Sequence, residues 1–225
     1  YAPVGKTVKV QAHSRMKANS YQKDGVGLES CSGSAWDVMV VDNTRNRAGY
    51  FLTSTTVSSE STSLNLTAAL TRVSNQYTDR SAAPFTLLDT IVRELELVCQ
   101  ANPQQIFPPV YVNWSTLNAP AGNGSLTDKQ TGKIVTSHYT VELVGDSLKP
   151  NLYILGKEDV DTDEYDDHVV AHEFGHYLED QLYRSDSIGG SHTMSDLLDP
   201  RVAFGEGFGN AISGMTFDNS IYVDT

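Results

Sequence analysis

The residues of this sequence best suited to chemistry are two histidines and a glutamate spaced as H-E-x-x-H: His172, Glu173 and His176. On an α-helix, residues four apart point the same way, so His172 and His176 would present both imidazoles on one face. Two imidazoles placed in this way can bind one Zn²⁺, and the Glu173 carboxylate can reach a water on that metal. The pattern therefore predicts a zinc centre with Glu173 as its general base.

A catalytic zinc centre typically has three protein ligands and one open position, so a third ligand must come from elsewhere in the chain. The downstream candidates are His192, Asp196, Asp199 and Glu206. Asp199 directly precedes Pro200, an arrangement better suited to a helix N-cap. His192 lies in a Gly-Gly-Ser loop, which positions ligands less well than a helix.

Glu206 is the third ligand that we favour, with His192 as the alternative. Glu206 lies on the predicted last helix, one turn before Asn210. Glu206 could therefore bind the metal while Asn210 orients a metal ligand through a hydrogen bond.

Two helices are predicted to carry these residues. The motif helix has an apolar stripe at helical spacing and ends near Tyr183; its members are Val170, Phe174, Leu178 and Leu182. The last helix begins after Asp199 and continues to about Gly214. It contains glycines at 205, 207, 209 and 214, each of which costs a helix about 1 kcal/mol relative to alanine. We infer that its backbone must pass close to another element, the motif helix.

The preceding residues predict an α+β fold. Apolar residues recur at three and four from Pro84 to about Asn102, as in an amphipathic helix. Strands are predicted at 108–114, 134–144 and 151–156, with a loop at 117–132. Residues 1–73 read as a separate antiparallel β accessory module with strands near 6–16, 35–41, 50–57 and 63–73. The polar segment 74–83 reads as a linker, and 84–225 as the catalytic part.

An acidic run, Glu158 to Asp167, has seven carboxylates in ten residues and precedes the motif helix. Negative charge at a helix N-terminus is favourable, and clustered carboxylates are also the ligands that Ca²⁺ prefers. The run is not an EF-hand loop, because Glu164 stands where the turn glycine is needed. Both a calcium site and a solvated helix start remain open, and we favour the latter.

Composition restricts the partners. The net charge of −12 and the lack of a basic patch argue against nucleic acid. No apolar run approaches the roughly 18 residues that cross a bilayer. The chain opens Tyr1-Ala-Pro-Val without a leader, as a mature secreted or periplasmic protein would. Cys31 and Cys99 could form a disulfide or remain two buried thiols, and the sequence does not decide.

The two zinc-site segments resemble the gluzincins, a clan of zinc metallopeptidases that includes thermolysin-like enzymes and related aminopeptidases. The resemblance rests on His172-Glu173-x-x-His176 and on Gly205-Glu206-Gly-Phe-Gly-Asn210, and it spans roughly residues 84–214. The second segment is similar to the clan's N-E-G-F-A and N-E-x-x-x-D patterns. It departs at Gly205, where the clan usually has Asn, and at Asn210, where thermolysin-like enzymes have Asp.

The resemblance implies a zincin-like mixed sheet, a Glu ligand on a second helix, and peptide or protein substrates. Endopeptidase is favoured, because the G-x-M-E-N segment that exopeptidases of this clan use to bind the substrate amine is absent. Clan members usually continue into a C-terminal helical part, so a missing C-terminal part of the same protein is expected. His192 and Tyr183 are weak candidates for stabilising the oxyanion. The alternative function is a secreted adhesion or binding protein with a structural or vestigial zinc site.

Overall fold

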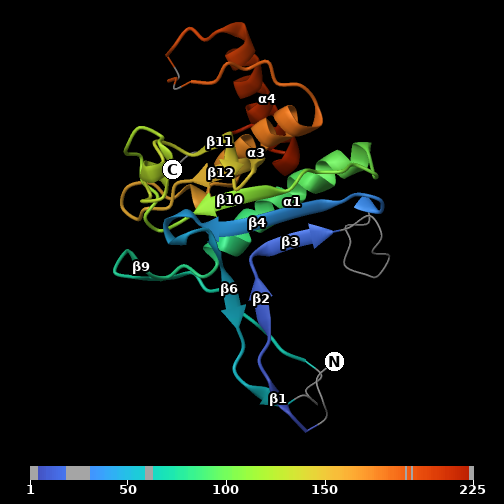
Figure 1. The fold of residues 1–225 in the computed structure, drawn as a ribbon, viewed down its shortest axis with the longest axis vertical. Helices are drawn as coiled ribbons and strands as arrows, with labels where there is room; N and C mark the ends of the chain where they lie inside the picture. Colours follow the sequence, from blue (N-terminus) through green and yellow to red (C-terminus); the bar gives the residue numbers. More distant parts are fainter. Residues whose placement is uncertain (1–4, 19–30, 59–62, 191, 194, 223–225) are drawn as a thin grey trace.

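Three apolar segments that are far apart in the sequence pair in parallel at the centre of a six-stranded sheet. The structure is a computed structural model and describes residues 5–18, 31–58, 63–190, 192–193 and 195–222. In spatial order the strands are β11 (His138–Val144), β12 (Ser147–Ile154), β10 (Val110–Trp114), β4 (Trp36–Asp42) and β3 (Arg15–Ala18), with β5 (Ala48–Gly49) also paired to β4. The central strands β12, β10 and β4 are parallel, and the outer strands are antiparallel to their neighbours. The sheet is therefore mixed, and the fold is α+β, as the sequence predicted (Figure 1).

Helices α1 (Ala83–Ala101) and α3 (Asp167–Leu182) pack their apolar residues against this sheet, while α4 (Pro200–Phe217) lies against α3 (Figure 1). Alternate residues of the strands, such as Val110 and Val112, join Leu87 and Ile91 of α1 and Phe174 of α3 in one buried core. These helix bounds agree closely with those that the sequence predicts.

Residues 115–137, which include α2 (Leu126–Lys129), contact the other face of the sheet. Tyr153 of β12 points to this face and packs with Ile134 and Leu155 in a second buried cluster. Asn118 ties the covering segment to the sheet, because its Nδ2 donates to the carbonyl oxygens of Asn113 and Ile154 at 3.3 and 2.9 Å. The sequence predicted only a loop here, and α2 was missed because it is a single short turn.

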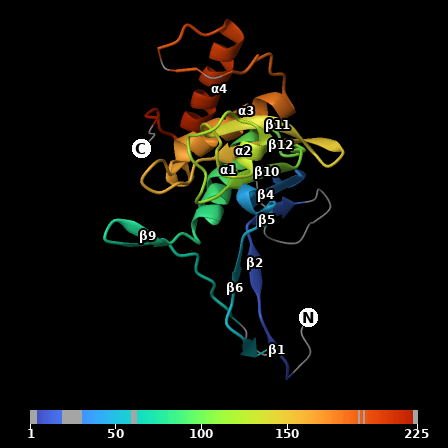
Figure 2. The same cartoon turned by 60° about the vertical axis from the view of Figure 1, so that its left-hand side comes forward.

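A narrow two-stranded ribbon projects away from the helices (Figures 1 and 2). It is built from β2 (Gln11–His13) with β6 (Phe51–Thr53), and further out from β1 (Thr7–Val8) with β7 (Val57–Ser58). A further hairpin joins β8 (Thr71–Val73) to β9 (Gln76–Asp79) through Ser74 and Asn75, both at positive φ.

The separate module expected over residues 1–73 differs from what is observed, because β3, β4 and β5 belong to the central sheet. The near-continuous apolar run of β4 is typical of a strand buried on both faces, and that feature signals a central parallel strand rather than an antiparallel module. The expected linker at 74–83 instead contains β9, and the strand expected over 63–73 is reduced to β8.

The structure decides between the two states of the cysteines that the sequence left open. Cys31 and Cys99 form a disulfide that links the segment before β4 to the end of α1. Within the ranges that the structure describes, no helix is long and apolar enough to cross a membrane.

Candidate metal centre

Helices α3 and α4 approach each other unusually closely because glycines face the contact. A Cβ atom on Gly209 would lie 2.9 Å from the His172 ring, and one on Gly175 would lie 2.6 Å from Ile212 Cγ2. A Cβ on Gly205 would lie 3.1 Å from Glu179 Oε2. The close approach that the sequence predicted for the glycine-rich helix is thus found at 205 and 209. Gly207, by contrast, faces open space.

This contact brings three possible metal ligands together from the two helices. His172 Nε2 lies 3.0 Å from His176 Nε2 and 3.0 Å from Glu206 Oε2. His176 Nε2 lies 3.6 Å from Glu206 Oε1. Among the described residues, these three form the group whose donor atoms all lie within 4.8 Å of one another.

The donor set fits Zn²⁺ in both chemistry and spacing. Zinc binds imidazole nitrogen and carboxylate oxygen, and bonds of about 2.0–2.1 Å in a tetrahedron place ligand atoms about 3.3 Å apart. The observed separations of 3.0 to 3.6 Å bracket that value. The side chains of His172, His176 and Glu206 retain 10%, 19% and 25% exposure, so the centre is recessed but open to solvent.

Asn210 fixes the orientation of one ligand. Its Oδ1 lies 3.0 Å from His172 Nδ1, one helical turn beyond Glu206 on α4. A carbonyl oxygen can only accept, so the proton of a neutral His172 sits on Nδ1 and the lone pair of Nε2 faces Glu206 and His176. One turn earlier on α3, His168 Nδ1 lies 2.6 Å from Ser213 Oγ. The two helices are thus joined by successive polar contacts along one line.

The histidines and Glu206 shift one another's pKa values. Burial acts to raise the pKa of Glu206, but the contacts with His172 and His176 outweigh it and hold that pKa far below its usual value. Burial by itself would lower the pKa of His172. The contacts with Glu206 and the nearby Glu173 carboxylate outweigh burial and raise this pKa above its usual value. The carboxylate is therefore ionised, as a metal ligand must be.

Glu173 points from the same helix toward the edge strand of the sheet. Its Oε2 accepts a hydrogen bond from the backbone N–H of Tyr139 in β11 at 2.9 Å. The Tyr139 hydroxyl in turn donates to Asp180 Oδ2 at 2.6 Å. The carboxylate is thereby held between α3 and β11, and it contributes negative charge to the environment of His172.

The other candidates from the sequence lie at different distances from the centre. His192 Nε2 lies 3.5 Å from Glu206 Oε2, but His192 is not among the three side chains whose donor atoms cluster. Asp199 caps α4 by accepting from the backbone N–H of Arg201. Asp196 accepts from the backbone N–H of Thr193. Tyr183 is the exposed residue that ends α3.

The acidic run provides no cluster of metal ligands among the described residues. Its carboxylates instead contact protein groups: Glu158 accepts from the backbone N–H of Tyr77, Asp163 from Ser137, and Glu164 pairs with Arg80. The geometry therefore gives no support to a calcium site there.

Sequence reasoning missed the roles of Tyr139 and Ser213. Tyr139 occupies an unremarkable strand position, and no local pattern indicates that its N–H meets a helix carboxylate. Ser213 is seven residues beyond Glu206, two turns along the same helix, and this spacing could have indicated a partner for His168, four residues before His172.

Comparison of the chain with models of protein families, with curated proteins and with solved structures gave no match.

Proposed function

We propose that this chain is a zinc-dependent peptidase, with endopeptidase activity favoured. The observation that carries the proposal is the convergence of His172 and His176 on α3 with Glu206 on α4, beside a glutamate that follows the first histidine directly. A purely structural zinc site has no need of such a glutamate, and it usually closes its fourth position with another protein ligand.

Each residue has a distinct role. His172, His176 and Glu206 would hold the ion, and Asn210 keeps Nε2 of His172 free to bind it. When bound, zinc supplies Lewis acidity for a peptide carbonyl and lowers the pKa of a water. Glu173 would accept a proton from a water molecule on its carboxylate and would pass it to the leaving amine.

The position of β11 favours a peptide as substrate. β11 is an edge strand, paired with β12 on one side, and it lies against α3. An extended peptide can add to such an edge by backbone hydrogen bonds. The Tyr139 N–H is already engaged by Glu173, so a peptide would use the other backbone groups of β11. The disulfide Cys31–Cys99 is compatible with a secreted or periplasmic setting, which we propose as well.

The test compares metal content and casein hydrolysis in wild type and Glu173→Gln. We expect about one zinc per chain in both proteins by elemental analysis, since Glu173 is not a ligand. We expect turnover to fall by about 10²-fold or more in the variant, because it loses the general base. Glu96→Gln on α1 is the matched control and should keep full activity.

Two outcomes would count against the proposal. If wild type binds zinc but hydrolyses no peptide, the alternative of a binding protein with a structural zinc site is favoured. The centre is not a metal site if neither wild type nor Glu173→Gln retains zinc and if Glu206→Gln has the same affinity for added zinc as wild type.

A further inference from the structure

A polar cavity lies on the face of the sheet opposite α3, between the end of β4 and α2. It has a volume of about 320 Å³, and its wall includes Asn43, Thr44, Asn46, Arg47, Lys129 and Tyr153. Tyr153 belongs to the cluster beneath residues 115–137, whereas its neighbours Leu152 and Ile154 point into the core shared with α3. The cavity is therefore separated from the candidate metal centre by the sheet. We propose that this cavity binds a small oxyanion, a phosphate or carboxylate group.

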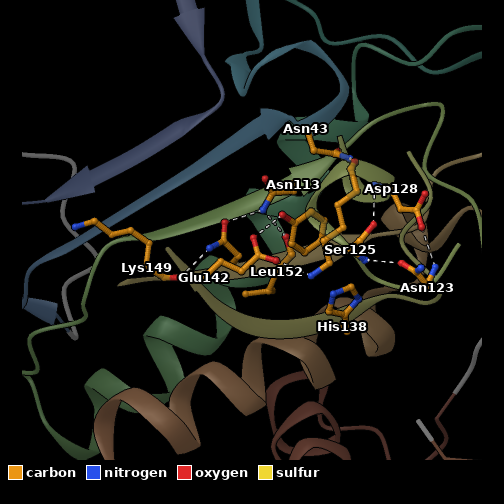
Figure 3. Close-up of polar contacts among 12 residues, drawn as sticks. Asn43, Asn113, Asn123, Ser125, Asp128, His138, Glu142, Lys149 and Leu152 are labelled. Atoms are coloured by element: carbon orange, nitrogen blue, oxygen red, sulfur yellow. Dashed lines mark hydrogen bonds and ion pairs between the residues drawn. The ribbon is translucent and has the colours of Figure 1, made fainter. Parts of the chain in front are cut away.

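The charges that face the cavity are unbalanced. Lys129 Nζ lies 2.6 Å from Glu142 Oε1, and Arg47 Nη2 lies 3.5 Å from Glu142 Oε2. Both cations therefore share one carboxylate that is not itself a lining residue, and the lining of the cavity has two cations and no Asp or Glu. Glu142 is ionised, because hydrogen bonds from Lys129 and from the Tyr153 hydroxyl (2.8 Å) lower its pKa in spite of its burial. Figure 3 shows Glu142 and Asn43 among the polar residues of this region.

The two cations are held in place. Lys129 is only 6% exposed, and its ammonium group lies 4.4 Å from the centre of the Tyr153 ring. The guanidinium of Arg47 lies 5.2 Å from the centre of the Tyr111 ring. Arg47 Nη1 is buried and has no hydrogen-bond partner among the described residues. A guanidinium beside a fixed ammonium group in the wall of a cavity is a favourable arrangement for an oxyanion, since guanidinium geometry matches carboxylate and phosphate oxygens.

The occupant must be small. The whole chain carries a net charge of −12, which repels long polyanions such as nucleic acids. Two cations in the wall of a cavity of about 320 Å³ instead suit a small molecule or ion with a single anionic group, to which the Asn46 side chain offers a further polar contact.

The test is calorimetric titration of the folded chain with sodium phosphate and, separately, sodium acetate, against sodium chloride at equal ionic strength. We expect saturable binding of at least one of the two oxyanions; which one binds distinguishes a phosphate from a carboxylate ligand. Arg47→Gln should weaken binding about tenfold or more, because it removes the guanidinium from the wall. Arg45→Gln is the matched control: it removes the same charge two residues away, at an exposed position that is not among the lining residues, and should change affinity less than about twofold.

Two further variants sharpen the result. Glu142→Gln removes the competing carboxylate and should tighten binding. Asn46→Asp adds a carboxylate at an exposed position with φ 51°, a conformation that aspartate tolerates, and should weaken binding without unfolding the chain. The proposal is overturned if neither oxyanion binds by about 20 mM. It is equally overturned if Arg47→Gln and Asn46→Asp bind as wild type does, which would place the anion elsewhere, for instance at the metal centre.

Discussion

At the scale of single residues, the candidate metal centre depends on which ring nitrogen of His172 carries the proton. Asn210 accepts from Nδ1 of His172 and so leaves Nε2 free for the cluster with His176 and Glu206. Its replacement would leave the ring free to rotate and to exchange tautomers. We therefore expect a residue outside the three candidate ligands to influence metal affinity.

Asn210→Ala is expected to lower zinc affinity by about 10- to 100-fold, because the His172 ring loses its hydrogen-bond acceptor. Competition with a chromogenic chelator measures the change. Asn210→Asp is the control, since it keeps an acceptor oxygen at the same position and should bind zinc nearly as tightly as wild type. Equal affinity of the alanine variant and wild type would show that the contact does not orient the ring.

Glu94 of α1 is a second residue whose environment matters, because it makes the stability of the protein depend on pH. It is completely buried, and neither carboxylate oxygen has a hydrogen-bond partner in the described part of the chain. Burial raises its pKa well above the usual value. The folded state therefore holds the proton more tightly than the unfolded state does, and stability falls as pH rises from the unfolded-state pKa of about 4.3 toward the raised value.

Glu94→Gln removes this linkage and keeps the shape of the side chain. The variant should be more stable than wild type at pH 8, and the difference should be smaller at pH 5, where wild-type Glu94 ionises less in the unfolded chain. Urea unfolding at the two pH values measures it. Glu96→Gln, two residues along α1, serves as the control for loss of a carboxylate from the same helix, and its effect on stability is the baseline for the Glu94→Gln difference. A difference that stays constant or shrinks with rising pH would contradict the assignment.

At the scale of secondary-structure elements, the candidate site forms because α3 and α4 pack closely against each other. Glycines at 175 and 209 permit backbone contact, and the ligand-bearing faces then meet. Glycine in a helix lowers helix stability, so its use here sacrifices local stability for close packing. Not every glycine in α4 serves that purpose, since Gly207 faces open space.

Gly209→Ala and Gly207→Ala form a matched pair on one helix. The first places a methyl group 2.9 Å from the rigid His172 ring and should lower both zinc affinity and stability, the latter by about 1–3 kcal/mol. The second adds a methyl group in open space and should raise stability by about 0.5–1 kcal/mol. Urea unfolding at fixed zinc concentration measures both. Similar effects of the two substitutions would mean that helix contact does not constrain residue 209.

At the scale of the whole molecule, the N-terminal residues are part of the central sheet. β4 lies beside β10 in parallel register, and Val38 and Val40 are buried with the apolar residues of α1. The disulfide between Cys31 and Cys99 fastens the same region to α1. A division of the chain near residue 73 would cut through one hydrophobic core.

Removal of residues 1–73 should therefore abolish cooperative folding, because β10 loses its neighbour and the core loses Trp36, Val38 and Val40. Thermal and urea unfolding of the chain 74–225, followed by circular dichroism, measures this. A truncated chain that unfolds in one sharp transition and still binds zinc would show that residues 1–73 are an independent module.

The sequence by itself determined the elements whose signals are local. The histidine spacing, the Asp199-Pro200 start of α4 and the periodic apolar residues of α1 each repeat within one or two helical turns, and the structure has these helices close to their predicted bounds. The choice of Glu206 over His192 also followed from local reasoning, since Glu206 and Asn210 share one helix face. The structure gathers Glu206 with the two histidines.

Only the tertiary structure decided which distant segments meet. β4 pairs with β10 across about seventy residues of sequence, Glu173 accepts from a backbone N–H of β11, and Arg47 shares Glu142 with Lys129. Such contacts leave no periodic trace in the sequence, because each depends on packing of the whole core rather than on the conformation of neighbouring residues. Local patterns therefore indicated which residues could hold a metal, and long-range packing placed the remaining groups around them.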